Sequence, residues 1–232
     1  MGILAIASAV MCWSAGGSLR ILGLATLLAI CIQGVLGGIR VRANSTPLAM
    51  VHGIWAQICF ALACLVVLLA SPELRRIGNA APVRGLHFFR RLCLAGVLAT
   101  FLQLVFGAAY RHFGNTHALI AHLLWAVALI VLLSWIAIWT LEQYSSYGLL
   151  LKFGRALAAL IGVQMLLGGL AFLVVVMGAQ VGDTLRWMIP AGHVLAGAMI
   201  LACMAALTVC SFQILAAPRL AKISADGWAV TS

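Results

Sequence analysis

Long apolar stretches alternate with short polar ones along the chain, and this alternation predicts its secondary structure. A helix that crosses a bilayer needs about 20 consecutive apolar residues. Six stretches approach or exceed that length, at residues 19–39, 48–70, 92–110, 117–139, 156–177 and 188–216. Only helices and closed barrels satisfy their backbone hydrogen bonds in lipid, and these stretches are too long for barrel strands. The pattern therefore predicts an all-α fold, a polytopic transmembrane helical bundle with six full spans.

A shorter apolar stretch, Gly2 to Trp13, precedes the first of these spans. It is too short to cross a bilayer alone. It also lacks the basic segment and small-residue cleavage site of a signal peptide. We expect it to form a partial span, the inner half of a helix.

The composition agrees with a membrane protein. Hydrophobic residues make up 65% of the chain and charged residues 8%, and the mean hydropathy is +1.18. In soluble domains these shares are nearer about a half and about a quarter. Seven cysteines lie inside the apolar stretches without C-x-x-C spacing, so we interpret them as small buried hydrophobic residues.

The basic residues predict how the chain sits in the membrane. The net charge is +10, but the 14 Lys and Arg residues form no continuous stripe, so nucleic acid is not an expected partner. Ten of them fall on one side of the predicted spans: Arg20, Arg75, Arg76, Arg84, Arg90, Arg91, Lys152, Arg155, Arg219 and Lys222. Because cytoplasmic loops are enriched in Lys and Arg, this side, with the C-terminus, is predicted to be cytoplasmic.

One motif occurs three times: Gln-x-x-x-Gly near the end of a predicted helix, followed by a histidine near the start of the next. The copies are Gln33–Gly37 with His52, Gln103–Gly107 with His122, and Gln164–Gly168 with His193. The glutamine precedes the histidine by 19, 19 and 29 residues, and the histidines recur at intervals of 70 and 71. Such regular spacing indicates an internal repeat, here a helical hairpin. The predicted orientation places the three histidines near the outer face, each roughly a turn inside its helix.

The repeated histidines are the candidate metal ligands. The four acidic residues, Asp183, Asp226, Glu73 and Glu142, all fall in predicted loops, so the spans contain no carboxylate for acid–base chemistry. The residue one turn after each histidine is small: Ala56, Ala126 and Gly197. A flat macrocycle can lie against such a face, and histidines at matched depth on facing helices ligate heme iron from both sides. The alternative is a hydrogen-bonded histidine at the membrane interface.

Other residues around the motif have two interpretations each. The glycines Gly37, Gly38, Gly107, Gly168 and Gly169 are expected to allow close helix packing. The glutamines are expected to hydrogen-bond across the bundle or to orient an imidazole. Trp55 and Trp125 are placed to pack against the edge of a macrocycle.

Four arginines lie at the predicted outer mouth: Arg40, Arg42, Arg111 and Arg186. They are candidates for pairing with heme propionates, or else plain interfacial anchors. Three further histidines lie outside the motif. We interpret His87 as solvated in the basic inner loop, and His112 and His117 as surface residues of an outer loop within reach of a propionate.

Three histidines are an odd number for paired ligands. Counting back from Gln33 by the spacings of the later repeats, a fourth histidine would fall before Met1. We expect a helix start carrying that histidine either to be missing upstream or to be supplied by another chain.

With these motifs the chain resembles the heme A synthases of bacterial and mitochondrial membranes. The matching segments begin at Gln33, Leu48, Gln103 and Gly192, and they occur in the family's order and spacing. The resemblance covers nearly the whole chain and implies two fused four-helix bundles, without the first span and the start of the second. The implied domains are 1–74, the remainder of the N-terminal bundle; 75–91, a basic cytoplasmic linker; 92–216, a C-terminal heme b bundle; and 217–232, a cytoplasmic tail.

The resemblance also implies a reaction. Heme A synthases oxidise a methyl group of heme O to a formyl group, which gives the heme A of terminal oxidases. By resemblance, His122 and His193 ligate an electron-transferring heme b, and His52 is the catalytic histidine at the heme O site. The family's second histidine and its glutamate at that site have no counterpart here.

The resemblance further implies the cofactors, partners and location of the chain. Its cofactor is heme b, and heme O and heme A are its substrate and product. Its candidate partners are membrane lipid, heme O synthase and cytochrome oxidase assembly proteins, with a homo-oligomer left open. Its location is the bacterial cytoplasmic (inner) membrane. Two other classes remain open: a membrane b-type cytochrome without substrate chemistry, and a heme-free assembly or transport subunit.

Overall fold

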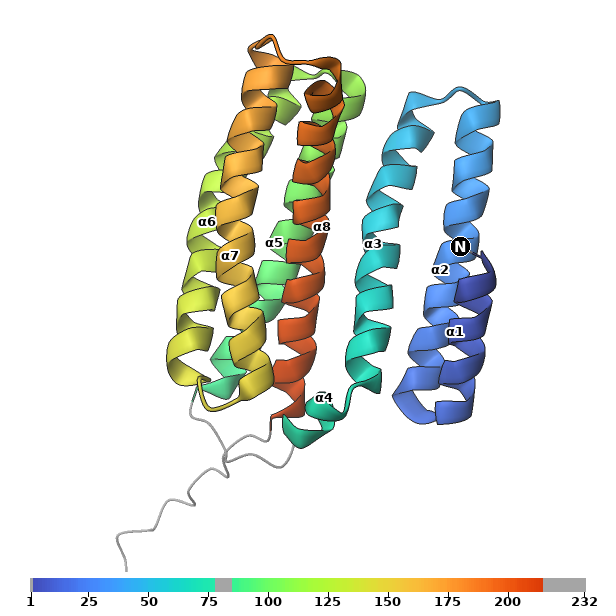
Figure 1. Cartoon of the computed structure of the whole chain (residues 1–232), viewed down its shortest axis with the longest axis vertical. Coiled ribbons are helices and arrows are strands. Elements are labelled where there is room, and N and C mark those ends of the chain that lie inside the picture. Colours follow the sequence, from blue (N-terminus) through green and yellow to red (C-terminus); the bar gives the residue numbers. More distant parts are fainter. Residues whose placement is uncertain (1, 78–84, 215–232) are drawn as a thin grey trace, which may run out of the picture.

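The fold is described by a computed structural model over residues 2–77 and 85–214, and in these ranges the regular structure is helical, with no strand (Figure 1). Six helical segments are long and apolar enough to cross a membrane. They are α2 (Gly17–Arg42), α3 (Thr46–Ala70), α5 (Leu86–Phe113), α6 (Thr116–Gln143), α7 (Gly148–Ala171) with its π-helical end η1 (Phe172–Val176), and α8 (Asp183–Gln213). The predicted six-span helical bundle is confirmed, and the shorter apolar stretch forms α1 (Gly2–Ala15).

Four of the long helices form a closed ring. In this ring α5 packs on α6, α6 on α7, α7 on α8, and α8 back on α5. Consequently α6 and α8 face each other diagonally across the ring rather than packing side by side. Helix α8 is the central one, because 67% of its most apolar window is buried, against 11–22% for the other five spans.

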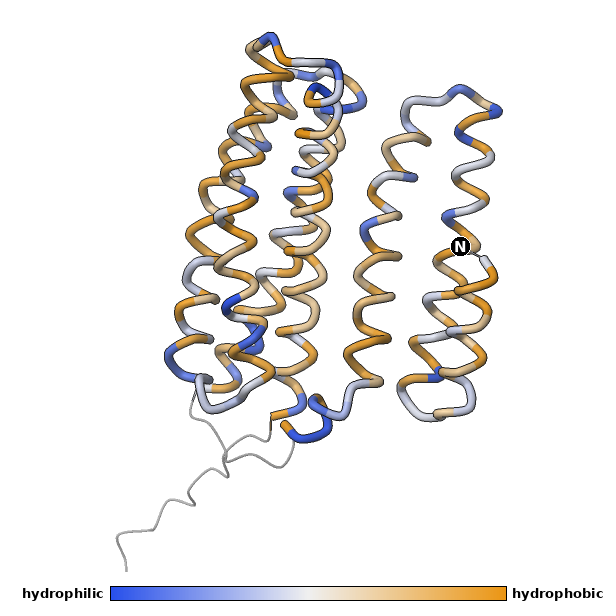
Figure 2. Tube along the Cα trace, in the orientation of Figure 1, coloured by the Kyte–Doolittle hydropathy of each residue, from blue (hydrophilic) through white to orange (hydrophobic). Residues whose placement is uncertain are grey.

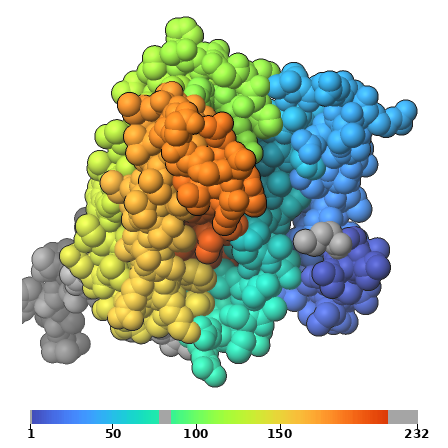
Figure 3. All heavy atoms as spheres, turned by 45° about the horizontal axis from the view of Figure 1, so that its top comes forward, coloured from blue at the N-terminus to red at the C-terminus, as the bar shows by residue number. Residues whose placement is uncertain are grey.

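The N-terminal helices form a row beside this ring. Helix α3 packs on α8 and α5, α2 packs on α3, and α1 packs on α2. With the end that carries the α2–α3 turn tilted forward, α1 and α2 lie at one edge of the molecule, beyond α3 (Figure 3). The short helix α4 (Pro72–Ile77) contacts α3, α7 and α8 at the opposite end.

The first two hairpins share their turn chemistry. Each turn contains a residue with positive φ, Asn44 at 43° and Gly114 at 62°. The next residue caps the following helix: the Ser45 side chain accepts from the Leu48 backbone N–H, and Asn115 accepts from His117. Asparagine and glycine tolerate the left-handed region best. The 70-residue repeat therefore extends to the turns and sets the same Gln-to-His distance in both hairpins.

The third hairpin also joins a glutamine helix to a histidine helix, but through a longer connection. Helix α7 continues as η1, the chain turns at Gly178 with φ 69°, and α8 begins at Asp183. The expected last span began five residues too late, because the polar first turn of α8 does not look like part of a membrane segment. This connection accounts for the ten extra residues between Gln164 and His193.

The predicted basic linker at residues 75–91 is helical at both ends. Arg75 and Arg76 belong to α4, and Arg90 and Arg91 belong to α5. The same holds for Lys152 and Arg155, which lie in α7 rather than in a loop. Basic side chains at a helix end were interpreted as loop residues because they interrupt the apolar pattern. Arg84 and the predicted tail 217–232 lie outside the described residues.

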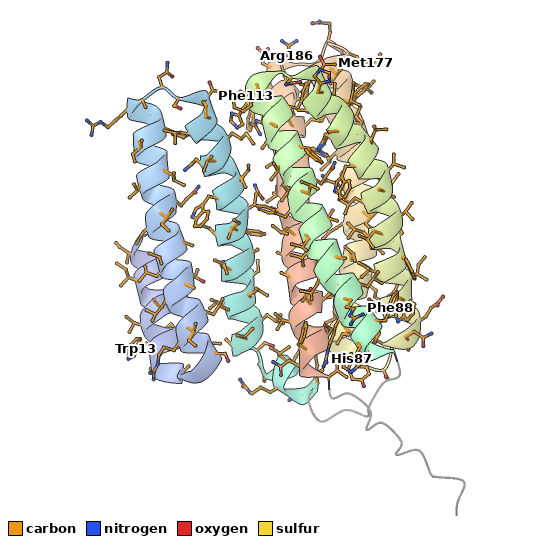
Figure 4. All side chains as sticks on the ribbon, turned by 180° about the vertical axis from the view of Figure 1, so that it is seen from behind. Trp13, His87, Phe88, Phe113, Met177 and Arg186 are labelled. Atoms are coloured by element: carbon orange, nitrogen blue, oxygen red, sulfur yellow. The ribbon has the colours of Figure 1, made fainter. Side chains whose placement is uncertain are left out.

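Polar residues concentrate at the two ends of the helices, as Figure 2 shows. The described acidic residues also lie there and are exposed: Glu73 in α4, Glu142 near the end of α6, and Asp183 in the first turn of α8. The expectation that they occupy loops was wrong, but none lies deep within a span. Figure 4 shows Phe113, Met177 and Arg186 at one end of the bundle, and Trp13, His87 and Phe88 at the other.

Candidate functional site

The repeated glutamine and histidine meet inside the first two hairpins. The Gln33 side-chain nitrogen lies 3.3 Å from Nε2 of His52 and donates to the His52 backbone oxygen at 3.2 Å. The Gln103 nitrogen lies 3.4 Å from Nε2 of His122 and donates to the His122 backbone oxygen at 3.0 Å. Both roles expected for the glutamines are found in these hairpins, because each side chain hydrogen-bonds to the neighbouring helix and lies against the imidazole.

The hydrogen bonds assign the proton of the His122 ring. Nδ1 lies 3.2 Å from the backbone oxygen of Gln103, which can only accept, so Nδ1 carries the hydrogen. Nε2 then holds the lone pair toward which the Gln103 amide points. A histidine whose Nδ1–H is held by a carbonyl is well prepared to bind a metal through Nε2.

The repeated glycine makes room for the imidazole in all three hairpins. A Cβ atom added to Gly37 would lie 3.1 Å from Cε1 of His52. The corresponding distances are 2.9 Å from Gly107 to His122 and 3.0 Å from Gly168 to His193. Any side chain at these positions would press against the ring, so the imidazole can lie where it does only because the residue is glycine.

The neighbouring glycines behave differently. A Cβ atom on Gly38 or Gly169 would meet nothing within 4 Å. The expectation that these two glycines bring helices close together is therefore wrong. The sequence could have shown the difference, because only the first glycine of each pair recurs at the same distance from the glutamine in every copy.

His122 and His193 face each other across the four-helix ring. Their ring centroids lie 6.3 Å apart and their planes meet at 83°. Both histidines are partly buried, and they come from the diagonal helices α6 and α8. Their convergence depends on the third hairpin, whose longer connection still seats His193 against Gly168.

The separation of the two rings fits one shared metal ion. A metal–imidazole bond is about 2 Å long and the nitrogen lies about 1 Å from the ring centre, so rings on opposite sides of one ion have centres about 6 Å apart. Perpendicular ring planes do not oppose this, because each ring can rotate about its bond to the metal. In the described residues no group of three or more His, Cys, Asp or Glu could hold a metal ion. Two axial imidazoles are therefore the form of metal binding that this pair supports.

Buried amide oxygens surround the candidate site. The side-chain oxygens of Gln33, Gln103 and Gln164 are buried without a hydrogen-bond partner, as is Nδ1 of His193. Buried polar atoms without partners are rare and call for an explanation. Their repetition in all three hairpins is what we expect where a further group belongs.

The residue one turn after His193 is Gly197, and the room expected beside it for a macrocycle is occupied by side chains. A Cβ atom on Gly197 would lie 3.2 Å from Leu104 and 3.6 Å from the amide nitrogen of Gln164. Both side chains are flexible and approach the surface that a macrocycle would cover. A bound macrocycle would have to turn them aside.

His52 shares the glutamine and glycine contacts of His122, but its Nδ1 is buried without a partner and no imidazole lies opposite it. Among the described residues, the pair His122 and His193 is the only ring contact between histidines. His112 approaches the next residue of the same helix, since its Nε2 lies 4.0 Å from a Cβ atom built on Gly53. Its charged neighbours are Arg111 and Arg40.

The predicted positions of the other histidines need correction. His112 lies in the last turns of α5 and is partly buried, rather than in an outer loop. His117 is the second residue of α6, and His87 the second residue of α5, and both are exposed. His112 was missed because polar residues at the end of α5 interrupt the apolar stretch without ending the helix.

The repeated tryptophans cross-link helices. The indole N–H of Trp55 donates to the Ala29 backbone oxygen, and that of Trp125 donates to Ala99, both at 2.9 Å. Each bond joins the two helices of one hairpin across 26 residues. These tryptophans are therefore anchored to a neighbouring helix below the histidine.

The four mouth arginines do not form one cluster. Arg40 is partly buried, and its Nε atom is buried without a partner. Arg42, Arg111 and Arg186 are exposed. All four lie at the histidine end of their helices, as predicted, but only Arg40 turns a polar atom into the protein.

No family model, curated protein or solved structure matches this chain.

Proposed function

We propose that this chain is a membrane heme protein of the heme A synthase kind, with heme b held by His122 and His193. The observation that carries the proposal is the 6.3 Å separation of their ring centroids, which suits one iron between two imidazoles. The proposal is supported by the close approach of each imidazole to a glycine and by the buried glutamine oxygens that have no partner. When bound there, heme b supplies one-electron transfer.

The chain's own residues prepare this site. The Gln103 backbone oxygen holds the Nδ1 proton of His122, which leaves Nε2 as the ligand atom. Gly107 and Gly168 fix the positions of the two rings. The apolar helices around them exclude water and lower the local dielectric.

His52 is the proposed catalytic residue of the second site, where the methyl group of heme O is oxidised to the formyl group of heme A. The support is its repeated environment, Gln33 at 3.3 Å and Gly37 behind the ring, together with the sequence resemblance. A protein with one heme would not need this third copy. Arg40, at the same end of the N-terminal row, is the candidate partner for a heme carboxylate.

A membrane b-type cytochrome without substrate chemistry is the second candidate. The observation that favours it is the lack of an imidazole opposite His52 in the described residues. The two functions differ in the porphyrins that the protein contains. Heme extracted from the purified protein should include heme O, heme A or a hydroxylated intermediate if it is a synthase, and heme b alone if it is a cytochrome.

The assignment of ligands is tested by three alanine variants. His122→Ala and His193→Ala should each abolish the low-spin heme b spectrum of the purified protein. His52→Ala should leave that spectrum intact and lower the content of heme O or heme A. Loss of heme b from the His52 variant would contradict the separation into two sites, and a wild-type protein without a Soret band would refute the proposal.

A further inference from the structure

A cavity lies at the end opposite the histidines, between the N-terminal helices and α8. Its volume is about 320 Å³, which is at the lower end of the range for ligand pockets. The lining residues come from α2, α3, α4 and α8: Ser18, Leu19, Leu69, Leu74, Arg75, Val209 and Gln213. Helices α2 and α8 do not pack on each other, so this cavity is the gap between the N-terminal row and the four-helix ring.

Arg75 is the charged residue of this cavity, and it has no partner among the described residues. Arg90 and Lys152 at this end do have partners. Arg90 donates to the backbone oxygens of Ser211 and Ile214 at 3.0 and 2.7 Å, and Lys152 pairs with Glu73 at 2.9 Å. Arg75 is exposed, and no described carboxylate pairs with it, so its positive charge is free to meet a ligand.

The rest of the lining is partly apolar and partly polar, as a phospholipid is. Leu19, Leu69 and Val209 present apolar surface from three helices. Ser18 and Gln213 add a hydroxyl and an amide that form no hydrogen bond within the described residues. A headgroup phosphate needs a cation and neutral donors, and its acyl chains need apolar surface. The cation with its neutral donors and the apolar side chains lie together in this cavity, at one end of the helices.

We propose that this cavity binds an anionic phospholipid, with the phosphate at Arg75 and the acyl chains along Leu19, Leu69 and Val209. Basic pockets between transmembrane helices at a cytoplasmic face are typical sites for anionic headgroups. The bound lipid fills the gap between α2 and α8 and so holds the N-terminal row against the ring. This site is independent of heme.

The test is native mass spectrometry of the purified full chain with added phosphatidylglycerol or phosphatidylcholine. The wild type should retain phosphatidylglycerol in preference to phosphatidylcholine. Arg75→Gln should lower phosphatidylglycerol occupancy about fivefold, the effect expected of one basic residue near a headgroup. Arg91→Gln and Arg155→Gln are matched controls, because both arginines are exposed at the same end and neither lines this cavity.

Three outcomes would overturn the proposal. Equal losses in Arg75→Gln and in the controls would show a diffuse charge effect. Inorganic phosphate that displaces phosphatidylglycerol at millimolar concentration would identify a free anion as the ligand. Binding that appears only after deletion of residues 215–232 would assign the cavity to that segment of the chain. Thermal unfolding of Arg75→Gln, measured alongside, should match the wild type without lipid, which separates lost binding from misfolding.

Discussion

The absence of a Cβ atom at the repeated glycine decides where the imidazole ring can lie. Gly168 and Gly169 are neighbours in α7, but an added Cβ would lie 3.0 Å from the His193 ring at the first and within 4 Å of nothing at the second. A contact that short forces the ring or the helix to move, whereas the open position has room for a methyl group. The two glycines therefore form a natural pair for a test.

Gly168→Ala should displace His193 and lower both heme b content and stability, the latter by about 1–3 kcal/mol. Gly169→Ala should leave the heme spectrum unchanged and alter stability by at most about 1 kcal/mol, in the stabilising direction, because alanine is the better helix former. Heme content per protein and unfolding in a denaturing detergent measure the two effects. Equal behaviour of the two variants would show that the glycine does not seat the ring.

The Gln103 amide competes with iron for the same nitrogen. Its distance of 3.4 Å from Nε2 of His122 is long for a hydrogen bond. Such a bond contributes about 0.5–1.5 kcal/mol, which corresponds to at most about a tenfold change in affinity. The backbone oxygen that orients the ring is unaffected by a side-chain substitution.

Gln103→Leu should therefore keep heme b and bind it up to about tenfold more tightly, measured by heme titration of the apoprotein. Gln57→Leu is the control, because Gln57 is also a glutamine with a buried oxygen but lies in α3, away from His122. Complete loss of heme from the Gln103 variant would mean that the side chain supports the bound state.

At the scale of the helices, the repeated hairpin is the unit that the sequence predicts best. The 70-residue interval and the shared turn, with Asn44 in one copy and Gly114 in the other, follow from residue type alone. The ends of the helices were harder to predict, because Arg90 and Lys152 interrupt the apolar pattern without ending a helix.

The contacts between hairpins did not follow from the residue spacing, and only the family resemblance implied that residues 92–216 form one bundle. Nothing in the spacing shows that α6 and α8 lie diagonally, and the convergence of His122 and His193 is a property of that packing. The contact between the repeated glycine and the imidazole ring was also missed, because a small residue at a helix interface usually indicates packing between helices.

Each of the first two hairpins has a tryptophan that bonds across it. Trp125→Phe removes the indole N–H that donates to Ala99 but keeps an aromatic ring, so it should lower the free energy of unfolding by about 0.5–1.5 kcal/mol. Trp55→Phe should cost a similar amount through Ala29. Because the two bonds lie in different hairpins, the double variant should show the sum.

The control for these variants is Trp187→Phe, at a side chain that is 65% exposed. It should leave detergent unfolding unchanged. A loss of stability in the control as large as that in Trp125→Phe would trace the effect to the aromatic surface rather than to the bond.

In the whole molecule, the N-terminal row is attached to the ring mainly through α3. The ion pair between Glu73 and Lys152 also connects the two parts, but its side chains are 46% and 66% exposed. Surface pairs of this kind contribute about 0–1 kcal/mol. Apolar packing of α3 on α8 and α5, together with the proposed lipid, must therefore account for most of the attachment.

The distribution of charge gives the molecule a direction in the membrane. Of the described Lys and Arg residues, seven lie at the end that carries α4 and four at the histidine end. The excess predicts that the α4 end is cytoplasmic and that the candidate heme site faces outward. Two exposed turn residues, Ala43 at the histidine end and Ser145 at the opposite end, allow a direct test.

Single variants Ala43→Cys and Ser145→Cys should react differently with a membrane-impermeant maleimide added to intact spheroplasts. Ala43→Cys should be labelled, and Ser145→Cys should be labelled only after the membrane is opened. The unmodified chain serves as the background. The expectation that all seven cysteines are buried was wrong for Cys31, which is exposed, but Cys31 lies in the middle of the span α2, away from the turns that the maleimide reaches. Labelling of Ser145→Cys in intact cells would reverse the orientation and move the candidate heme site to the cytoplasmic face, where a different set of electron donors would reach it.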